Sequence, residues 1–180
     1  MKPPLAVDLD GTLIRGDLFA RAMARFCAAA PWHVLVLLAW LTRGRAYAKA
    51  QLAALYPVDA AALPYNEAFV NWLREERAGG RVLVLATAFD RAGAEAVAAH
   101  LGLFERVFAS DGRTNLKSHA KARALAAAFP QGFAYAGNER ADLAVWRAAK
   151  AAVIVNATDA LVRRARAAFN VERVFDRGMP

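Results

Sequence analysis

The hexapeptide Asp8-Leu9-Asp10-Gly11-Thr12-Leu13 decides how the rest of the chain is interpreted. The apolar residues 5–7 precede it as a run too short for a helix, which predicts a buried strand ending at Asp8. Gly11 allows the backbone to turn sharply, and Thr12 can hold that turn through local hydrogen bonds. We therefore expect both carboxylates to emerge together at the carboxyl edge of a sheet.

Such a pair of carboxylates implies a particular chemistry. Acids at one edge of a sheet repel each other unless a cation or an electron-poor group lies between them. Mg²⁺ suits this place because it is a hard ion that takes carboxylates, waters and substrate phosphate as ligands. Asp8 could then attack phosphorus while Asp10 transfers a proton. The competing interpretation is a strand-end Asx turn in which the second acid caps a neighbouring element.

The motif with its preceding strand resembles the first motif of the haloacid dehalogenase (HAD) superfamily of phosphotransferases. Within that superfamily, the stretch from Leu5 to Asn156 is most similar to the domain fused ahead of UbiA-type prenyltransferases. The resemblance implies a Mg²⁺-dependent phosphatase in which Asp8 forms an aspartyl-phosphate and Asp10 acts as acid and then as base. It also implies that both residues contribute to the metal site, Asp10 through its backbone carbonyl.

A second polar element, Thr87-Ala88, follows the β-rich run at 81–86. The Thr87 hydroxyl and the backbone N–H that follows it are suitable donors for phosphoryl oxygens, and the element resembles the second HAD motif. A threonine after a strand is also a frequent helix N-cap. We predict that Thr87 and Ala88 bind the substrate.

A third element, Lys117, stands just before a predicted helix that Ser118 can cap. A lysine near two acids and a phosphoryl group offsets their charge, as the third HAD motif does. Lys121, one helical turn later, is the competing assignment. We favour Lys117 as the catalytic and substrate-binding lysine because Asn-Leu-Lys at 115–117 with a second lysine nearby resembles the UbiA-linked pattern. That pattern often has glycine where this chain has Ser118.

A fourth element, Asn138 to Asp142, follows the apolar run at 133–137. The fourth HAD motif usually reads Gly-Asp with another acid a few positions on, so the spacing fits apart from asparagine in place of the first acid. An amide oxygen can ligate Mg²⁺ without adding charge. We expect Asn138 and Asp142 to complete the metal site, with modest affinity and with Asp142 more important than usual.

Strand and helix patterns alternate along most of the chain, with further strands predicted at 107–109, 152–155 and 171–175. This alternation predicts an α/β fold, a Rossmann-like parallel sheet with helices on both faces and a site at its carboxyl edge. The region from Ile14 to about Tyr65 is helical in pattern and lacks strand signals, which predicts a small helical cap inserted after the first strand. We place the core at 1–15 and 66–180 and the cap at 16–65.

Composition narrows the classes of partner. A chain of 180 residues with net charge +8 and a pI near 10.2 favours anionic partners such as phosphorylated substrates or acidic lipid surfaces. Nucleic acid is not expected, because no interleaved basic and aromatic recognition motif is present. The single Cys27 excludes an internal disulfide and is consistent with a reducing cytosol. With no apolar leader before the first strand and no apolar run of spanning length, we expect a cytoplasmic protein.

The predicted cap is basic and carries an apolar stripe from Trp32 to Leu41. Up to Lys49 its basic residues face a single acid, Asp17; they are Arg15, Arg21, Arg25, Arg43, Arg45 and Lys49. One interpretation is an ordinary solvated face over a packed helix. The other is a surface suited to anionic lipid or a lipid-linked phosphate, which would place the protein peripherally at the inner face of the membrane.

The resemblance, together with these patterns, implies two alternative functions. The first is a Mg²⁺-dependent phosphomonoester hydrolase whose substrate is a small or lipid-linked phosphate. The second is a soluble HAD-fold partner or regulatory module of a membrane prenyltransferase, with weak or no catalysis because Asn138 replaces an acid.

Overall fold

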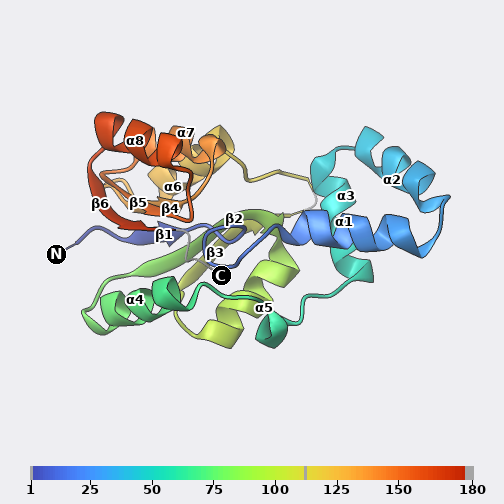
Figure 1. Cartoon of the computed structure of the whole chain (residues 1–180), viewed down its shortest axis with the longest axis horizontal. Helices are drawn as coiled ribbons and strands as arrows, with labels where there is room; N and C mark the ends of the chain where they lie inside the picture. The colour runs from blue at the N-terminus through green and yellow to red at the C-terminus, as the bar shows by residue number, and fades with distance from the viewer. Residues whose placement is uncertain (1, 112, 177–180) are drawn as a thin grey trace.

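The computed structural model describes residues 2–111 and 113–176. Its centre is a six-stranded parallel sheet in the order β3-β2-β1-β4-β5-β6 (Figure 1). The strands are β1 (Leu5–Val7), β2 (Leu83–Asp90), β3 (Arg106–Ser110), β4 (Ala134–Gly137), β5 (Ala151–Val155) and β6 (Val171–Phe175). The expected α/β fold with a parallel sheet is therefore confirmed, including the edge strand at 171–175.

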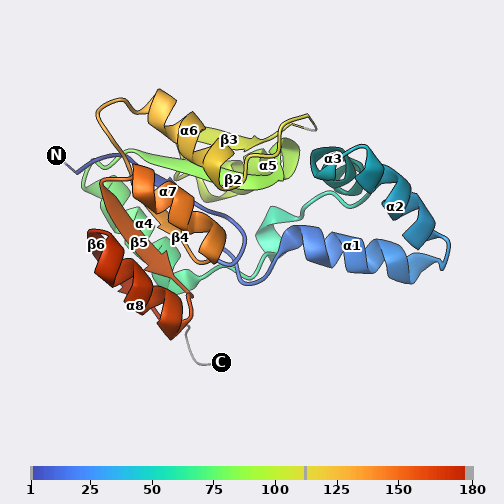
Figure 2. The same cartoon turned by 90° about the horizontal axis from the view of Figure 1, so that it is seen from above.

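Helices cover both faces of the sheet, as Figures 1 and 2 show. On one face lie α4 (Glu67–Ala78) and α5 (Arg91–Leu101), and on the other lie α6 (His119–Ala128), α7 (Leu143–Ala148) and α8 (Asp159–Ala168). Leu5 and Val7 of β1 pack on the first face, whereas Ala6 between them packs on the second. This alternation is the period of two that a strand imposes on its side chains. Because both faces are buried, the strands β1 and β5 are apolar throughout.

Several helices begin at a side chain that caps their first turn. The side chains of Asn66, Asp90 and Thr158 accept hydrogen bonds from backbone N–H groups in the first turns of α4, α5 and α8. Ser118 is an exception, because it precedes α6 without a side-chain capping bond and has a positive φ of 52°. A left-handed φ is unfavourable for a residue with a Cβ, which is a physical reason why glycine suits this position.

Three helices and a short 3₁₀ turn separate β1 from α4: α1 (Leu18–Ala29), α2 (His33–Thr42), α3 (Arg45–Leu55) and η1 (Ala60–Ala62). The three helices pack around their own small core of Phe26, Leu37 and Leu52, whereas Ala60 of η1 packs against the core of the sheet domain. The chain leaves and re-enters the sheet domain at one point, where Ile14 and Tyr65 form an isolated antiparallel bridge. The predicted helical insert is thus present, and this bridge lies close to the predicted boundaries at 15 and 66.

The apolar stripe of the insert is divided between two environments. Trp40 stacks on Phe26 with ring centroids 5.0 Å apart, and Val36 packs beside it. Trp32, by contrast, is 65% exposed. Among the residues that the structure describes, no helix is long and apolar enough to cross a bilayer.

The chain order of the strands creates a crevice at one end of the sheet. The chain moves from β1 outward through β2 to β3 and then returns to β4, which pairs with the other side of β1. In open parallel sheets, ligands bind beyond the carboxyl ends of the strands at such a reversal. Here that point lies between the segments that follow β1 and β4, where Asp8 and Asn138 are found.

Candidate active site

A cavity of about 580 Å³ opens at the carboxyl edge of the sheet and is bordered on its other side by the helical insert. All of the residues predicted to act at the site line it: Asp8, Asp10, Thr87, Ala88, Lys117, Asn138 and Asp142. The cavity therefore brings together four segments that are far apart in the sequence.

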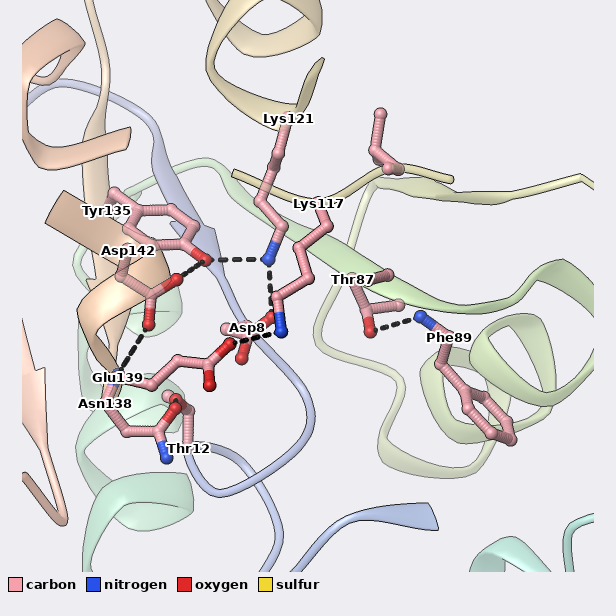
Figure 3. A network of polar contacts seen from close by, with 12 residues as sticks. Asp8, Thr12, Thr87, Phe89, Lys117, Lys121, Tyr135, Asn138, Glu139 and Asp142 are labelled. Atoms are coloured by element: carbon pink, nitrogen blue, oxygen red, sulfur yellow. Dashed lines mark hydrogen bonds and ion pairs between the residues drawn. The ribbon is translucent and has the colours of Figure 1, made fainter. Parts of the chain in front are cut away.

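Asp8 begins a buried chain of polar contacts (Figure 3). Lys121 Nζ donates to Asp8 Oδ1 at 2.6 Å and to the Tyr135 hydroxyl at 2.8 Å. That hydroxyl in turn donates to Asp142 Oδ1 at 2.8 Å. Lys121, Tyr135 and Asp142 are each at most 3% exposed, so the chain is shielded from water. Charge-assisted bonds of this kind fix the position of a carboxylate.

Burial dominates the electrostatics of Asp8. It raises the pKa of the Asp8 carboxyl well above its ordinary value, while the Lys121 ammonium opposes that shift and the Asp142 carboxylate adds to it. A buried acid next to a second acid is costly to ionise unless positive charge is close. Lys121 therefore supports the ionised form of Asp8.

The structure places Lys121, and not Lys117, against Asp8. Lys117 Nζ pairs instead with Glu139 Oε1 at 3.0 Å, and both of these side chains are about half exposed, at 47% and 51%. Lys121 lies in the first turn of α6, on the side of the helix that faces the strand ends. The assignment of Lys117 as the lysine that neutralises Asp8 thus differs from the geometry, although Lys117 does line the cavity.

Asp10 lies at the junction between the sheet and the helical insert. Its Oδ1 accepts a hydrogen bond from the backbone N–H of Leu18, the first residue of α1, at 2.8 Å. Burial raises the pKa of Asp10 to about 6, although the Leu18 hydrogen bond lowers it in part. A carboxyl group with a pKa near neutrality can give up a proton and take it back.

Thr87 and Ala88 occupy an interruption in the β2–β3 ladder. The pairing is regular up to Ala86 and then shifts before Asp90, so the residues between them leave the ladder. The Thr87 hydroxyl accepts from the Phe89 N–H at 2.9 Å, which turns the segment at this point (Figure 3). Irregularities of this type re-aim backbone and side-chain groups beside active sites. Strand β2 nevertheless continues to Asp90, beyond the run at 81–86 that the sequence predicted.

Asn138 lies directly against the turn after Asp8. Its Oδ1 accepts from the Thr12 hydroxyl at 3.3 Å, and a Cβ added at Gly11 would lie 2.0 Å from its Nδ2. Gly11 also has a φ of +74°, so both its conformation and its close approach to Asn138 require glycine. Asn138 is thus positioned beside the aspartate motif, as expected.

The oxygen atoms around Asp8 can be compared with what Mg²⁺ requires. The set comprises the carboxylates of Asp8 and Asp142, the amide oxygen of Asn138 and the backbone carbonyl of Asp10, and hard oxygen donors of this kind suit the ion. Asp142 is already constrained, because its Oδ2 accepts from the N–H groups of Asn138 and Glu139, each at 2.9 Å. Within residues 2–111 and 113–176, no three His, Cys, Asp or Glu side chains gather as a metal cluster. The donor types fit Mg²⁺, an ion that keeps several waters among its ligands.

Several cavity residues were not identified from the sequence. Lys49 of α3 reaches across to donate to the Ala88 carbonyl at 2.6 Å, and burial lowers its pKa. Arg45, the first residue of α3, also lines the cavity. Asn156 lines it too, and its Nδ2 donates to the Gly11 carbonyl at 3.1 Å. For the two α3 residues, the basic character of the insert was the only signal in the sequence.

Comparisons with known proteins found a relative by sequence and matches by structure. The uncharacterized protein y4nM of Sinorhizobium fredii is 40% identical over 154 residues, which is 86% of this chain. The chain spans only 30% of the length of that relative. A structure of a protein of unknown function from Bordetella pertussis Tohama I matches with a TM-score of 0.70 at 20% identity, covering 98% of this chain and 99% of that one.

Phosphoserine phosphatase has the same fold. Its apo form matches with a TM-score of 0.65 at 15% identity, and its phospho-aspartyl intermediate analogue with 0.62 at 16%. Each of these matches covers 98% of this chain and 94% of the other. The names of these four matches do not refer to a prenyltransferase, so the likeness to UbiA-fused domains stays a prediction.

A family model covers most of the chain. The model for haloacid dehalogenase-like hydrolases matches residues 5–147, which includes Asp8, Thr87, Lys121 and Asp142. The chain therefore belongs to the haloacid dehalogenase-like hydrolase family.

Proposed function

We propose that this chain is a phosphomonoester hydrolase that works through an aspartyl-phosphate intermediate on Asp8. The observation that carries the proposal is the buried contact of 2.6 Å between Asp8 Oδ1 and Lys121 Nζ at the carboxyl end of β1. A carboxylate nucleophile must be ionised and held still, and this contact supports both requirements. The structural likeness to a phospho-aspartyl intermediate analogue is consistent with this chemistry.

In the proposed reaction, Asp8 attacks the phosphorus of the substrate. Because Lys121 holds Oδ1, we assign the attack to Oδ2. The bond between phosphorus and the leaving oxygen breaks, and Asp10 gives its proton to that oxygen. Water then attacks the phosphorus of the aspartyl-phosphate while Asp10 takes a proton from it. The bond between phosphorus and Asp8 breaks, which releases inorganic phosphate and restores the carboxylate.

Other residues position the phosphoryl group. The Thr87 hydroxyl and the Ala88 N–H lie where the β2–β3 ladder is interrupted, and we assign them to the phosphoryl oxygens. When bound by Asp8, Asn138, Asp142 and the Asp10 carbonyl, Mg²⁺ would supply positive charge to the phosphoryl oxygens. Lys121 remains beside Asp8 in this arrangement and offsets the charge of the two buried acids.

The substrate class follows from the side of the cavity formed by the helical insert. Arg15, Arg45 and Lys49 line it together with the ring of Phe19, so the leaving group meets positive charge and an apolar surface. This lining fits a small or lipid-linked phosphate. Turnover across phosphorylated metabolites and lipid-linked phosphates, with and without Mg²⁺, tests the proposal. No turnover of any substrate under either condition would refute it.

A first prediction separates the two lysines of the cavity. Lys121→Met should lower kcat/KM by about 10²- to 10³-fold, the usual loss when one preorganised charge or donor is removed. Lys117→Met is the matched control, because its ion pair with Glu139 is half exposed and such pairs contribute little. Its effect should stay below about fivefold. Steady-state kinetics of both purified variants provide the measurement, and a larger loss in Lys117→Met would return the catalytic role to Lys117.

A second prediction concerns Asn138, the uncharged side chain that we propose as a Mg²⁺ ligand. Asn138→Asp is isosteric at the crowded contact with Gly11, and it adds a carboxylate beside Asp8 and Asp142. Mg²⁺ should therefore bind more tightly, by about tenfold given the strength of an added charge near an ion. Calorimetric titration of the protein with Mg²⁺ alone measures this without reference to turnover. Unchanged affinity would place Asn138 outside the metal site.

The alternative function is a partner or regulatory module with weak catalysis, and one observation favours it. The chain corresponds to 30% of the length of its Sinorhizobium fredii relative, so in that protein the domain is part of a longer chain. A partner role for a membrane prenyltransferase predicts that wild-type protein turns over no faster than Asp8→Asn. The substrate screen decides between the two functions.

A further inference from the structure

The outer face of α2 is apolar and uncovered. Three of its side chains and that of its N-cap residue Trp32 are strongly exposed: Trp32 at 65%, Val34 at 46%, Leu35 at 69% and Leu38 at 54%. We refer to these residues as the α2 face. The opposite side of the helix packs in the core of the insert through Leu37. A helix that is apolar on all sides is normally buried, and adjoining exposed apolar residues mark an interaction surface.

The charge around this face points to the chemistry of its partner. Residues 18–58 contain five basic residues and no Asp or Glu, so this stretch carries a net charge of +5. Two of the basic residues, Arg43 and Arg45, directly follow α2 and are exposed. The complementary surface is therefore apolar and anionic. A second copy of the chain does not fit, because pairing two α2 faces would bring two of these cationic stretches, residues 18–58, together.

The position of α2 fits a planar surface. Figures 1 and 2 both place it at the outer end of the molecule, away from the sheet. With 10 residues, the helix is half of the about 20 residues needed to span a bilayer, so it suits the headgroup region. Its carboxyl end also leads to the site, because Arg45 lines the catalytic cavity.

We propose that the α2 face inserts into the interfacial region of an anionic lipid bilayer, with Arg43 and Arg45 against the headgroups. Trp32 lies at the amino-terminal end of the helix, where an amphipathic ring suits the boundary between acyl chains and water. The inference does not depend on the proposed hydrolysis.

Cosedimentation with vesicles tests the proposal. The full chain should bind vesicles of phosphatidylcholine mixed with phosphatidylglycerol, and bind pure phosphatidylcholine much less. The double variant Leu35→Gln, Leu38→Gln should bind at least about tenfold more weakly, since two apolar side chains no longer insert. Arg43→Gln should weaken binding by about fivefold at low salt and by less at high salt.

Leu55→Gln is the matched control for the apolar pair. Leu55 of α3 is 55% exposed, almost the same as Leu38, but lies outside the α2 face. The Leu55→Gln variant should leave vesicle binding unchanged, and circular dichroism of all variants checks that they fold. Quenching of Trp32 fluorescence by brominated lipid, with Trp32→Phe subtracted, gives an independent measure of insertion.

Four results would overturn the proposal. The first is no binding to anionic vesicles, and the second is equal binding to neutral ones. The third is a dimer in sedimentation velocity that Leu35→Gln, Leu38→Gln abolishes, because it would assign the face to a second copy. Equal weakening by Leu55→Gln would likewise show that binding does not depend on α2.

Discussion

Asp8→Asn is expected to reduce phosphatase turnover to the background rate. The amide lacks the negative charge needed to attack phosphorus, and it cannot form the acyl-phosphate. The fold should be retained, because the ionised Asp8 carboxylate is itself disfavoured by burial and an amide oxygen can still accept from Lys121. Lys121 also keeps its 2.8 Å contact with the Tyr135 hydroxyl.

Steady-state assays and acid-quench trapping of labelled enzyme test this expectation together. Wild-type protein should carry trapped phosphate, and Asp8→Asn should carry none. Asp90→Asn is a matched control, since Asp90 caps α5 and asparagine caps a helix equally well. Normal turnover by Asp8→Asn, with Asp90→Asn also normal, would exclude Asp8 as the nucleophile.

The sheet and the order of the motifs could be predicted because they depend on local patterns. Apolar runs such as 151–155 are buried on both sides in a parallel sheet, and caps such as Asn66 and Asp90 act within one turn of the helices they begin. Asp8 and Asn138 follow strands that turned out to be neighbours. Strand ends that carry polar residues therefore predicted the place of the site.

The choice between Lys117 and Lys121 could not be made from local patterns. A lysine is normally exposed, and Lys121 is buried where it meets the Tyr135 hydroxyl and Asp8, which is 113 positions earlier in the sequence. The direction of the α6 axis decides which lysine faces the strand ends. The sequence around Ser118 indicated where the helix begins but not how it is oriented.

The role of Tyr135 likewise could not be predicted from local patterns. In the sequence it is one residue of a buried strand, and its burial was expected. Its hydroxyl links Lys121 to Asp142, so it belongs to the polar network of the site. Only the pairing of β4 with β1 and the packing of α6 bring these three side chains together.

Asp10→Asn is expected to slow hydrolysis by about 10²- to 10⁴-fold, the range that proton transfer by a positioned side chain contributes. This substitution separates the position of the Asp10 side chain from its ability to transfer a proton. The asparagine Oδ1 can still accept the 2.8 Å hydrogen bond from Leu18, so the start of α1 should not move. What the variant loses is a carboxyl group whose pKa is raised by burial to about 6.

Because Asp10 is proposed to act as an acid in the first step and as a base in the second, Asp10→Asn should affect two classes of substrate differently. A nitrophenyl phosphate needs little help to expel its leaving group, so Asp10→Asn should still form the aspartyl-phosphate and release one equivalent of nitrophenol in a burst. Hydrolysis of the intermediate would then be slow, because the attacking water loses its base. An alkyl phosphate needs the proton at the first step, so it should show no burst and accumulate no phosphoenzyme. Equal rates for wild type and variant with both substrates would mean that another group moves the proton.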